Sequence, residues 1–94
     1  MVRHIVMWKF KEGTQAQAKE FMEKLLSLKG QIPQIRAMEV GTDILGGGNY
    51  SAVLVSDFDS LEDVETYKND PRHKAVSALC KSIRVDRVAV DYEF

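Results

Sequence analysis

Apolar and polar positions alternate in some stretches of the chain, as in β-strands, and recur every three to four residues in others, as in helices. The first stretch, residues 2–11, is rich in β-branched and aromatic side chains. This composition predicts a β-strand. Both alternating sets of positions are apolar between residues 5 and 8, whereas a strand in a sheet with one wet face alternates cleanly. We therefore expect this strand to be covered on both faces.

The next segment has the period of a one-sided helix. Its apolar side chains recur three and four positions apart, at Ala18, Phe21, Met22, Leu25, Leu26 and Leu28. Thr14 and Gln17 have the spacing of a capping box. Gly30 suits the position just after a helix, and Pro33 prevents continuation. The helix is therefore expected to end near Lys29.

Two further strands are predicted in the middle of the chain, at residues 35–42 and 50–58. Residues 43–49 form the loop between them, and Gly46-Gly47-Gly48 gives this loop free backbone choice. A glycine run can indicate a phosphate-binding loop, but that motif requires a following Lys-Ser/Thr and a helix. Neither is present, so a flexible hairpin loop is predicted.

The second half begins with two helix-start signals. Ser60 is followed three residues later by Asp63, and Asp70 is followed directly by Pro71. An N-cap side chain and a proline at the first helical position both favour a helix start. Helices are therefore predicted after each signal, and the alternating residues 85–94 complete the chain as a strand.

The predicted order of elements is strand, helix, strand, strand, broken helix, strand. This is the split βαβ, ferredoxin-like β-α-β-β-α-β pattern of the α+β class. Its usual strand order, 4-1-3-2, gives a four-stranded antiparallel sheet with both helical segments on one face. The opposite face would expose apolar side chains at Ile5, Met7, Val53, Val55, Val88 and Val90. A monomer rarely exposes so much apolar surface, so we expect two sheets to close into a homodimeric α+β barrel.

Length and charge narrow the class of protein. A chain of 94 residues favours a single domain, and a formal net charge of −1 gives no electrostatic reason to expect nucleic acid or a membrane surface as partner. No stretch approaches the roughly 20 apolar residues of a membrane span or resembles a signal peptide. The single Cys80 lies on an apolar helix face and is expected to be a small buried hydrophobe. We therefore expect a cytoplasmic protein.

Candidate chemistry centres on the break between the two C-terminal helices. Asp70 and Pro71 place His73 in the first turn of a helix, where the field of the backbone N–H groups favours a neutral imidazole. Tyr67 lies one short turn earlier, so its phenol can face the same space. Such a pair can exchange a proton near neutral pH, but it is equally consistent with a satisfied piece of core. His4, on a strand face, is open to the same two interpretations.

Other chemistry has weaker support. Arg84 and Arg87 can hold an anionic substrate, or they can be solvated charges near a strand start. The side chains of His4, His73 and Asp91 are suitable metal ligands, but no short ligand spacing supports a metal site, and none is expected. Nothing in the chain beyond isolated histidines would ligate haem or orient flavin, so no cofactor is expected.

Several stretches, taken in order, carry a resemblance to a known family. They are Arg3-His4-Ile5-Val6 with Lys9-Phe10-Lys11, the passage from Asp57 to Asp63, the spacing of Tyr67 to Pro71-Arg72-His73, and the closing Val90-Asp91-Tyr92. Together they resemble the stress-responsive A/B barrel domain family, although no single motif is diagnostic. The resemblance covers almost the whole chain, so residues 1–94 are expected to form one such domain. It implies a dimeric α+β barrel; many members are homodimers of unknown function.

The resemblance also implies site residues. A plant polyketide cyclase of the family works without a redox cofactor, and its catalytic histidine and tyrosine have the spacing of His73 and Tyr67. Its first-strand histidine corresponds to His4, and the acid before its final tyrosine corresponds to Asp91. The resemblance therefore implies these four residues as catalytic candidates.

The departures from that cyclase concern the substrate. Ala52 stands where the cyclase has a further histidine, Trp8 where it has a leucine, and Arg84 and Arg87 where it has apolar groups. We therefore expect a smaller and more polar cavity. Plant members also hold a metal by backbone carbonyls in the turn after the first helix, here about residues 29–35, but carbonyl ligands leave no signature in the sequence.

The cavity between helices and sheet is expected to bind a small molecule. We expect its lining to include Val6, Trp8, Phe21, Met22, Leu25, Leu54, Val76 and Arg84. Three classes of function remain open: a lyase, cyclase or isomerase that uses Tyr67 and His73 on a small carbonyl or polyketide-like compound, a protein that binds a small molecule without converting it, and a dimeric module with a vestigial pocket.

Overall fold

The computed structural model describes residues 1–94 and has the predicted order of elements. The strands are β1 (Val2–Phe10), β2 (Ala37–Thr42), β3 (Ala52–Phe58) and β4 (Arg84–Glu93), and the helices are α1 (Gln15–Ser27), α2 (Leu61–Asn69) and α3 (Pro71–Ile83). The ferredoxin-like β-α-β-β-α-β prediction is therefore confirmed, with the second helical segment divided into α2 and α3. None of these helices has the length and apolar character needed to cross a lipid bilayer.

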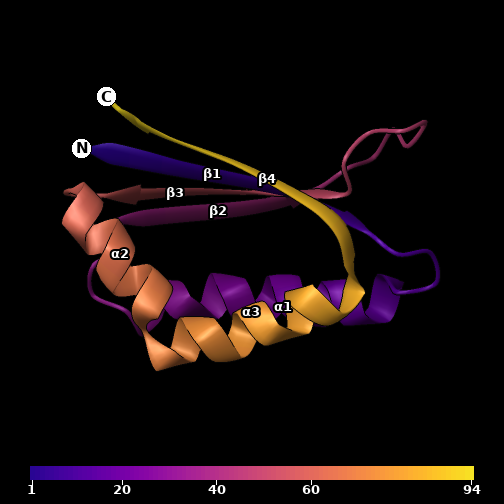
Figure 1. Cartoon of the computed structure of the whole chain (residues 1–94), viewed down its shortest axis with the longest axis horizontal. Coiled ribbons are helices and arrows are strands. Elements are labelled where there is room, and N and C mark those ends of the chain that lie inside the picture. The colour runs from indigo at the N-terminus through magenta and orange to yellow at the C-terminus, as the bar shows by residue number, and fades with distance from the viewer.

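The four strands form one antiparallel sheet in the order β2-β3-β1-β4, which is the predicted arrangement. β1 lies in the interior of the sheet between β3 and β4 (Figure 1). The register pairs His4 with Ser56 on one side and with Asp91 on the other. Trp8 is paired in the same way with Ala52 and Arg87. The two ends of β1 therefore have different neighbours, which matters for the cavity described below.

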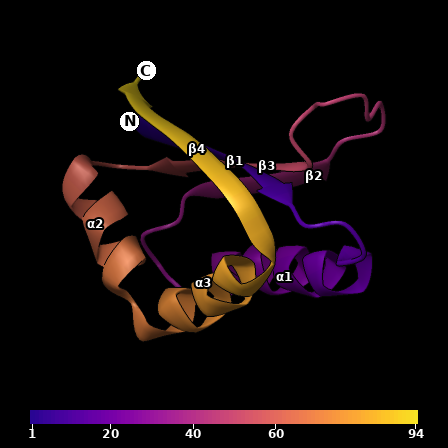
Figure 2. The same ribbon diagram turned by 45° about the vertical axis from the view of Figure 1, so that its right-hand side comes forward.

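All three helices lie on one face of the sheet (Figures 1 and 2). The side chains of β1 alternate accordingly: Val2, His4, Val6 and Trp8 are buried beneath the helices. The three apolar ones join a hydrophobic core of 16 buried residues to which every helix contributes. The layer between helices and sheet thus holds the hydrophobic core, with apolar side chains from both halves of the chain.

The opposite face of the sheet is uncovered, as predicted. The six apolar residues expected there lie in register across three strands: Ile5 pairs with Val55 and Val90, and Met7 pairs with Val53 and Val88. Met7 is 40% exposed and Val90 is 52% exposed. An apolar surface of this kind on a single chain marks an interaction site.

The predicted helix starts of α2 and α3 are confirmed. Ser60 Oγ accepts a hydrogen bond from the backbone N–H of Asp63 at 3.1 Å. Asp70 Oδ1 accepts one from the backbone N–H of Arg72 at 2.8 Å, and Pro71 occupies the first turn. Each cap satisfies a backbone donor that the helix itself leaves unpaired.

Two details around α1 were predicted wrongly. Thr14 forms no capping box: its hydroxyl donates to the carbonyl of Lys11 at 2.6 Å and leaves the helix start without a side-chain cap. Gly30 does not take the left-handed conformation of a helix stop. Instead, α1 passes into one turn of 3₁₀-helix, η1 (Leu28–Gly30), and Leu28 remains buried.

The loop between β2 and β3 projects beyond the sheet (Figure 2). Asp43 organises it, since its carboxylate accepts hydrogen bonds from the backbone N–H groups of Leu45 and Gly46 and from the side chain of Asn49. Gly46, Gly47 and Gly48 all have φ angles in the left-handed region. The three glycines therefore allow the chain to reverse direction sharply in this loop.

Candidate functional site

A cavity of about 310 Å³ lies between the helices and the sheet. Its lining combines apolar, aromatic and basic side chains: His4, Val6, Trp8, Phe21, Leu25, Leu54, Tyr67, Lys68, His73, Ser77, Cys80, Lys81, Arg84 and Arg87. Six of the eight residues predicted as cavity lining are among them. Met22 and Val76 are not, because Met22 lines a separate groove between α1 and β2 and Val76 belongs to the hydrophobic core.

Tyr67, on α2, occupies the centre of one end of this cavity. Its side chain is only 1% exposed, yet its hydroxyl has no hydrogen-bond partner in the protein. The ring lies between two imidazoles, with centroid distances of 4.3 Å to His73 and 6.3 Å to His4. Burial raises the pKa of the phenol well above its ordinary value, so the hydroxyl keeps its proton and can donate a hydrogen bond.

His73 lies in the first turn of α3 with its ring half-buried. Its Nδ1 lies 3.2 Å from the backbone carbonyl of Lys68. Because a carbonyl oxygen only accepts, Nδ1 carries the hydrogen of the neutral ring, and Nε2 keeps a free lone pair. Burial lowers the pKa of His73 below its ordinary 6.5, more than the Lys68 carbonyl raises it. The imidazole is therefore neutral at pH 7 and able to accept a proton.

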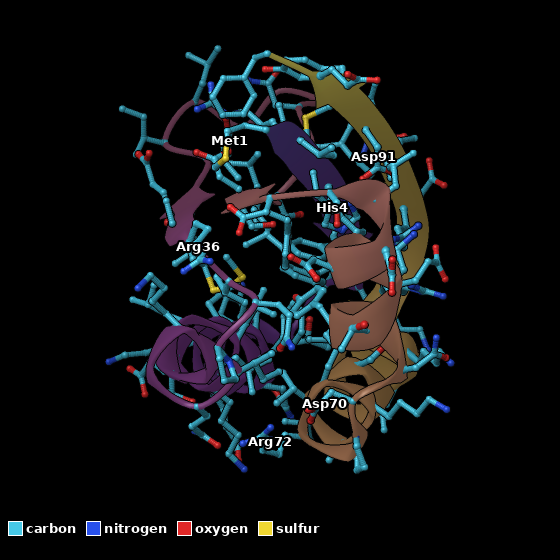
Figure 3. The ribbon with its side chains drawn as sticks, turned by 90° about the vertical axis from the view of Figure 1, so that its left-hand side faces the viewer. Met1, His4, Arg36, Asp70, Arg72 and Asp91 are labelled. Atoms are coloured by element: carbon cyan, nitrogen blue, oxygen red, sulfur yellow. The ribbon has the colours of Figure 1, made fainter.

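His4 is 2% exposed and is held by Asp91 from the neighbouring strand, with 2.6 Å between Nδ1 and Oδ1 (Figure 3). The carboxylate accepts, so Nδ1 of His4 donates and its Nε2 is the unsatisfied ring nitrogen. Burial of the ring lowers the pKa of His4 by more than the Asp91 carboxylate raises it. The structure thus brings together His4, Tyr67, His73 and Asp91, the four residues predicted as catalytic candidates.

The junction between α2 and α3 fixes the direction of His73. Arg72 donates to both carboxylate oxygens of Asp70, at 2.9 and 2.8 Å, and also to the carbonyl of Gln31 after α1, at 2.7 Å. This guanidinium holds the pKa of Asp70 down at about 2. Figure 3 shows the pair at the turn between the two helices. The start of α3 is therefore tied to the end of the first helical segment.

The same bond bears on the metal site that the resemblance implied near residues 29–35. One carbonyl of this turn, that of Gln31, already accepts a hydrogen bond from the Arg72 guanidinium. No group of three or more His, Cys, Asp or Glu side chains is arranged to hold a metal.

Four lining residues were not predicted as such from the sequence: Lys68, Ser77, Cys80 and Lys81. Ser77 and Lys81 follow His73 at four-residue steps along α3, and residues at this spacing share a helix face. That spacing was a usable signal once His73 was taken as a cavity residue. Cys80 is buried, as expected, and burial raises the pKa of its thiol.

The fold and the cavity define a class: a ferredoxin-like α+β domain with a small-molecule-sized cavity between helices and sheet. The chain matches the Stress responsive A/B Barrel Domain family over residues 2–94 and belongs to that family. The family predicted from the sequence is therefore confirmed.

Three relatives illustrate the range of this fold. A dimeric protein of unknown function with a ferredoxin-like fold, from Bacteroides fragilis, is 33% identical with a TM-score of 0.92, over 99% of this chain and 95% of its own. Olivetolic acid cyclase from Cannabis sativa is 27% identical over 95 residues, which span 97% of this chain and 94% of the cyclase. A hydroxynitrile lyase from Passiflora edulis has the same fold, with a TM-score of 0.84 at 22% identity over 97% of this chain and 90% of the lyase.

Proposed function

We propose that this protein is a lyase, cyclase or isomerase that performs acid–base chemistry on a small carbonyl or polyketide-like compound in the cavity beside Tyr67 and His73. The observation that carries the proposal is the buried hydroxyl of Tyr67, which has no partner in the protein. A buried polar group without a partner costs free energy. An oxygen atom of a bound ligand would satisfy it.

In the proposed reaction, Tyr67 donates a hydrogen bond to the carbonyl oxygen of the substrate. Nε2 of His73 removes a proton from the carbon beside that carbonyl, and the electron pair of the broken C–H bond forms an enolate. The Tyr67 hydroxyl stabilises the negative charge that develops on the oxygen. Returning the proton from the imidazolium to another carbon isomerises the substrate. If the enolate carbon instead attacks a second carbonyl carbon of the substrate, a C–C bond forms and the imidazolium protonates the resulting alkoxide. If a group β to the carbonyl departs, its bond to carbon breaks and the imidazolium gives the proton to that group.

His4 and Asp91 support this step from the sheet. The bond of 2.6 Å from His4 Nδ1 to the carboxylate fixes the tautomer and orientation of the ring. Its Nε2 is then available to hold a substrate oxygen or a water molecule. We assign His4 to binding and proton relay, and Asp91 to positioning His4.

Two of the relatives support this class of reaction. Olivetolic acid cyclase is named for ring closure and hydroxynitrile lyase for bond cleavage. Acid–base groups in one cavity can serve both kinds of reaction, because both require a proton to be removed at one atom and delivered at another. We do not propose the substrate of either relative for this protein.

We also propose that the protein is a homodimer closed through the uncovered sheet face. That face is apolar across three strands, around Ile5 and Met7. The Bacteroides fragilis relative, which is 33% identical, is dimeric. Burying this surface against a second copy would remove it from water without any change in the cavity, which lies on the other face.

The test is a screen of small β-keto acids, lactones and polyketide mimics for turnover, followed by variants. His73→Ala is expected to lower the rate by about 10²–10⁴-fold, and Tyr67→Phe by somewhat less. Tyr92→Phe is the matched control, because that tyrosine lies outside the cavity. Turnover by His73→Ala at the wild-type rate would disprove the assignment, and tight binding without turnover of any compound would indicate a binding protein instead.

A further inference from the structure

We propose that the ligand of this cavity carries an oxyanion, a carboxylate or a phosphate, at the end remote from its carbonyl group, and that Arg84 and Arg87 bind it. This assignment names the ligand class of the site described above and therefore rests on the proposed function. It comes from how charge is distributed along the cavity.

The sheet gives the cavity two chemically different ends. His4, Val6 and Trp8 lie on the same face of β1, and four residues of strand separate the first from the last by about 13 Å. On β4, Asp91 lies opposite His4, whereas Arg87 lies opposite Trp8. The histidine and Arg87 thus enter the cavity from positions four residues of strand apart.

The helix repeats this order. His73, Ser77, Lys81 and Arg84 all line the cavity from α3 and its C-terminal end. Eleven residues of helix separate His73 from Arg84 by about 16 Å. On both walls the proton-transfer groups therefore lie at one end of the cavity, and Lys81, Arg84 and Arg87 lie towards the other. Lys68 is the exception, since it follows Tyr67 on α2.

The basic end has no compensating acid. The lining contains four basic side chains, those of Lys68, Lys81, Arg84 and Arg87, and no aspartate or glutamate, although the whole chain has a net charge of −1. Of these four, only Lys68 is in an ion pair, with Glu65 at 3.8 Å.

The nearest carboxylates are already engaged elsewhere. Asp91 is bonded to His4, and Asp86 bonds the hydroxyl of Tyr50 and the backbone N–H of Arg87. The guanidinium of Arg87 forms no hydrogen bond of its own. Its charge also lowers the pKa of both cavity histidines, after the larger effect of burial, which shows that its field reaches into the cavity.

Size and geometry restrict the anion to a small molecule. A volume of about 310 Å³ lies at the lower end of the range of about 300–1,000 Å³ that ligand pockets span. Guanidinium groups bind carboxylate and phosphate oxygens in pairs with fixed geometry. An oxyanion held at Arg84 and Arg87 would direct the carbonyl at the other end of the ligand towards Tyr67.

The experiment measures binding rather than turnover. Trp8 is the only tryptophan and lines the cavity, so its fluorescence reports ligand binding directly. The probes are 8-oxononanoate, its uncharged methyl ester, and 7-oxooctyl phosphate, in which the same methyl ketone is far from the carboxylate, the ester or the phosphate. We expect at least one of the two anions to bind about tenfold or more tightly than the ester, with an affinity that falls as salt is raised. The carboxylate and phosphate arms show which oxyanion the site prefers.

Variants locate the effect. Arg84→Gln and Arg87→Gln should each lower the affinity for the preferred anion by about 10- to 100-fold and leave that for the ester within about threefold. Lys74→Gln is the matched control, since Lys74 is an exposed α3 lysine outside the lining. Equal affinity of wild-type protein for anion and ester would overturn the proposal. So would a preference that survives both arginine substitutions, or one that Lys74→Gln removes equally.

The outcome is separable from that of the proposed reaction. His73→Ala should keep the preference for the anion, because the arginines are untouched. If the preference is present while His73→Ala turns substrate over normally, the reaction mechanism fails and the ligand class stands. If turnover depends on His73 and the preference is absent, the ligand class fails alone.

Discussion

Tyr67 combines a large buried ring with an unsatisfied hydroxyl, and these two parts affect stability in opposite ways. The ring packs against Phe58, with 5.2 Å between centroids, and against both histidines. The hydroxyl is buried without a partner. Phenylalanine would fill the same space without the buried polar atom, so the hydroxyl fits the proposed role of Tyr67 as a donor to a ligand and is not required by the packing.

Replacing Tyr67 by phenylalanine should therefore separate stability from activity. We expect the free energy of unfolding to stay constant or to rise by up to about 2 kcal/mol, since an unsatisfied polar group is removed. Urea unfolding of the wild type and the variant measures this. A loss of more than about 1 kcal/mol would mean that the hydroxyl has a structural partner. Tyr50→Phe, which removes a hydroxyl bonded to Asp86 at the surface, is the control.

The two histidines predict how stability depends on pH. In the unfolded chain both titrate near their ordinary pKa of 6.5, and in the folded protein burial lowers both pKa values. Between the folded and unfolded pKa values the unfolded chain binds more protons, so folding is favoured as pH rises. The contribution is fully present above pH 6.5 and is lost as pH falls through the folded values.

Chemical unfolding between about pH 5 and pH 7.5 should therefore show a rising free energy of unfolding that levels off above neutrality. His73→Gln and His4→Gln should each reduce the slope in this window. Carboxylates such as Asp57, whose pKa is lowered from 3.8 by its bond to Arg3, act at lower pH and should leave the slope near pH 6 unchanged. Stability that falls between pH 5.5 and pH 7 would contradict the prediction.

At the scale of single residues, the sequence identified the members of the site better than their partners. Asp70-Pro71 located His73 at a helix start, and its spacing to Tyr67 placed both at one cavity. The bond from His73 to the carbonyl of Lys68 and the empty surroundings of the Tyr67 hydroxyl depend on the angle between α2 and α3. That angle is set by the packing of the two helices against the sheet, which local sequence patterns do not predict.

Among the elements, α3 is the one whose position decides the geometry of the site. Its first turn carries His73, and its start is fixed by the Asp70 cap and by Arg72, which reaches Gln31. A change at Asp70 or Arg72, which do not line the cavity, should therefore move the imidazole of His73 and leave the other lining residues in place.

Asp70→Ala is expected to lower the melting temperature, and Asp70→Asn to lower it less, because asparagine is an equally good N-cap. The NMR signals of the His73 ring should shift clearly in Asp70→Ala and only slightly in Asp70→Asn. Turnover of any identified substrate should follow the same order. Equal shifts in both variants would show that the charge pair with Arg72, and not the cap, holds the helix start.

The elements themselves were predictable because each has a clear period. The exceptions lie at helix ends, where several solutions compete: the Thr14 hydroxyl bonds back to Lys11 and does not cap α1, and Gly30 continues into a 3₁₀ turn. The lining of the cavity was predictable where strands supply it, since alternation fixes the face. It was incomplete where helices supply it: Ser77 follows His73 at helical spacing and was overlooked, whereas Lys68 lines the cavity because of the way α2 and α3 pack.

For the whole molecule, the uncovered sheet face leads to a prediction about assembly. Val53→Asp places a charge in the middle of this face, opposite Met7. If the face is buried in a dimer, the charge costs several kcal/mol and should give monomeric, unfolded or aggregated protein. Sedimentation at micromolar concentration and thermal unfolding measure the effect.

Leu61→Asp is the control for this substitution. Leu61 is exposed on α2, on the helical side of the sheet, so the same charge there should leave the oligomeric state and stability nearly unchanged. A wild-type protein that sediments as a stable monomer would contradict the homodimer.

The strand order has a consequence for how the chain folds. β1 has both its neighbours in the later part of the sequence: His4 contacts Ser56, 52 residues away, and Asp91, 87 residues away. Contacts between distant residues require large loops to close before they stabilise anything, and proteins dominated by them fold in milliseconds to seconds. Pulse-labelled hydrogen exchange during refolding should therefore protect the amides of α1 before those of β1. During synthesis, the strand that holds His4 is made before the other strands of the sheet and acquires its second partner only when β4 has been made.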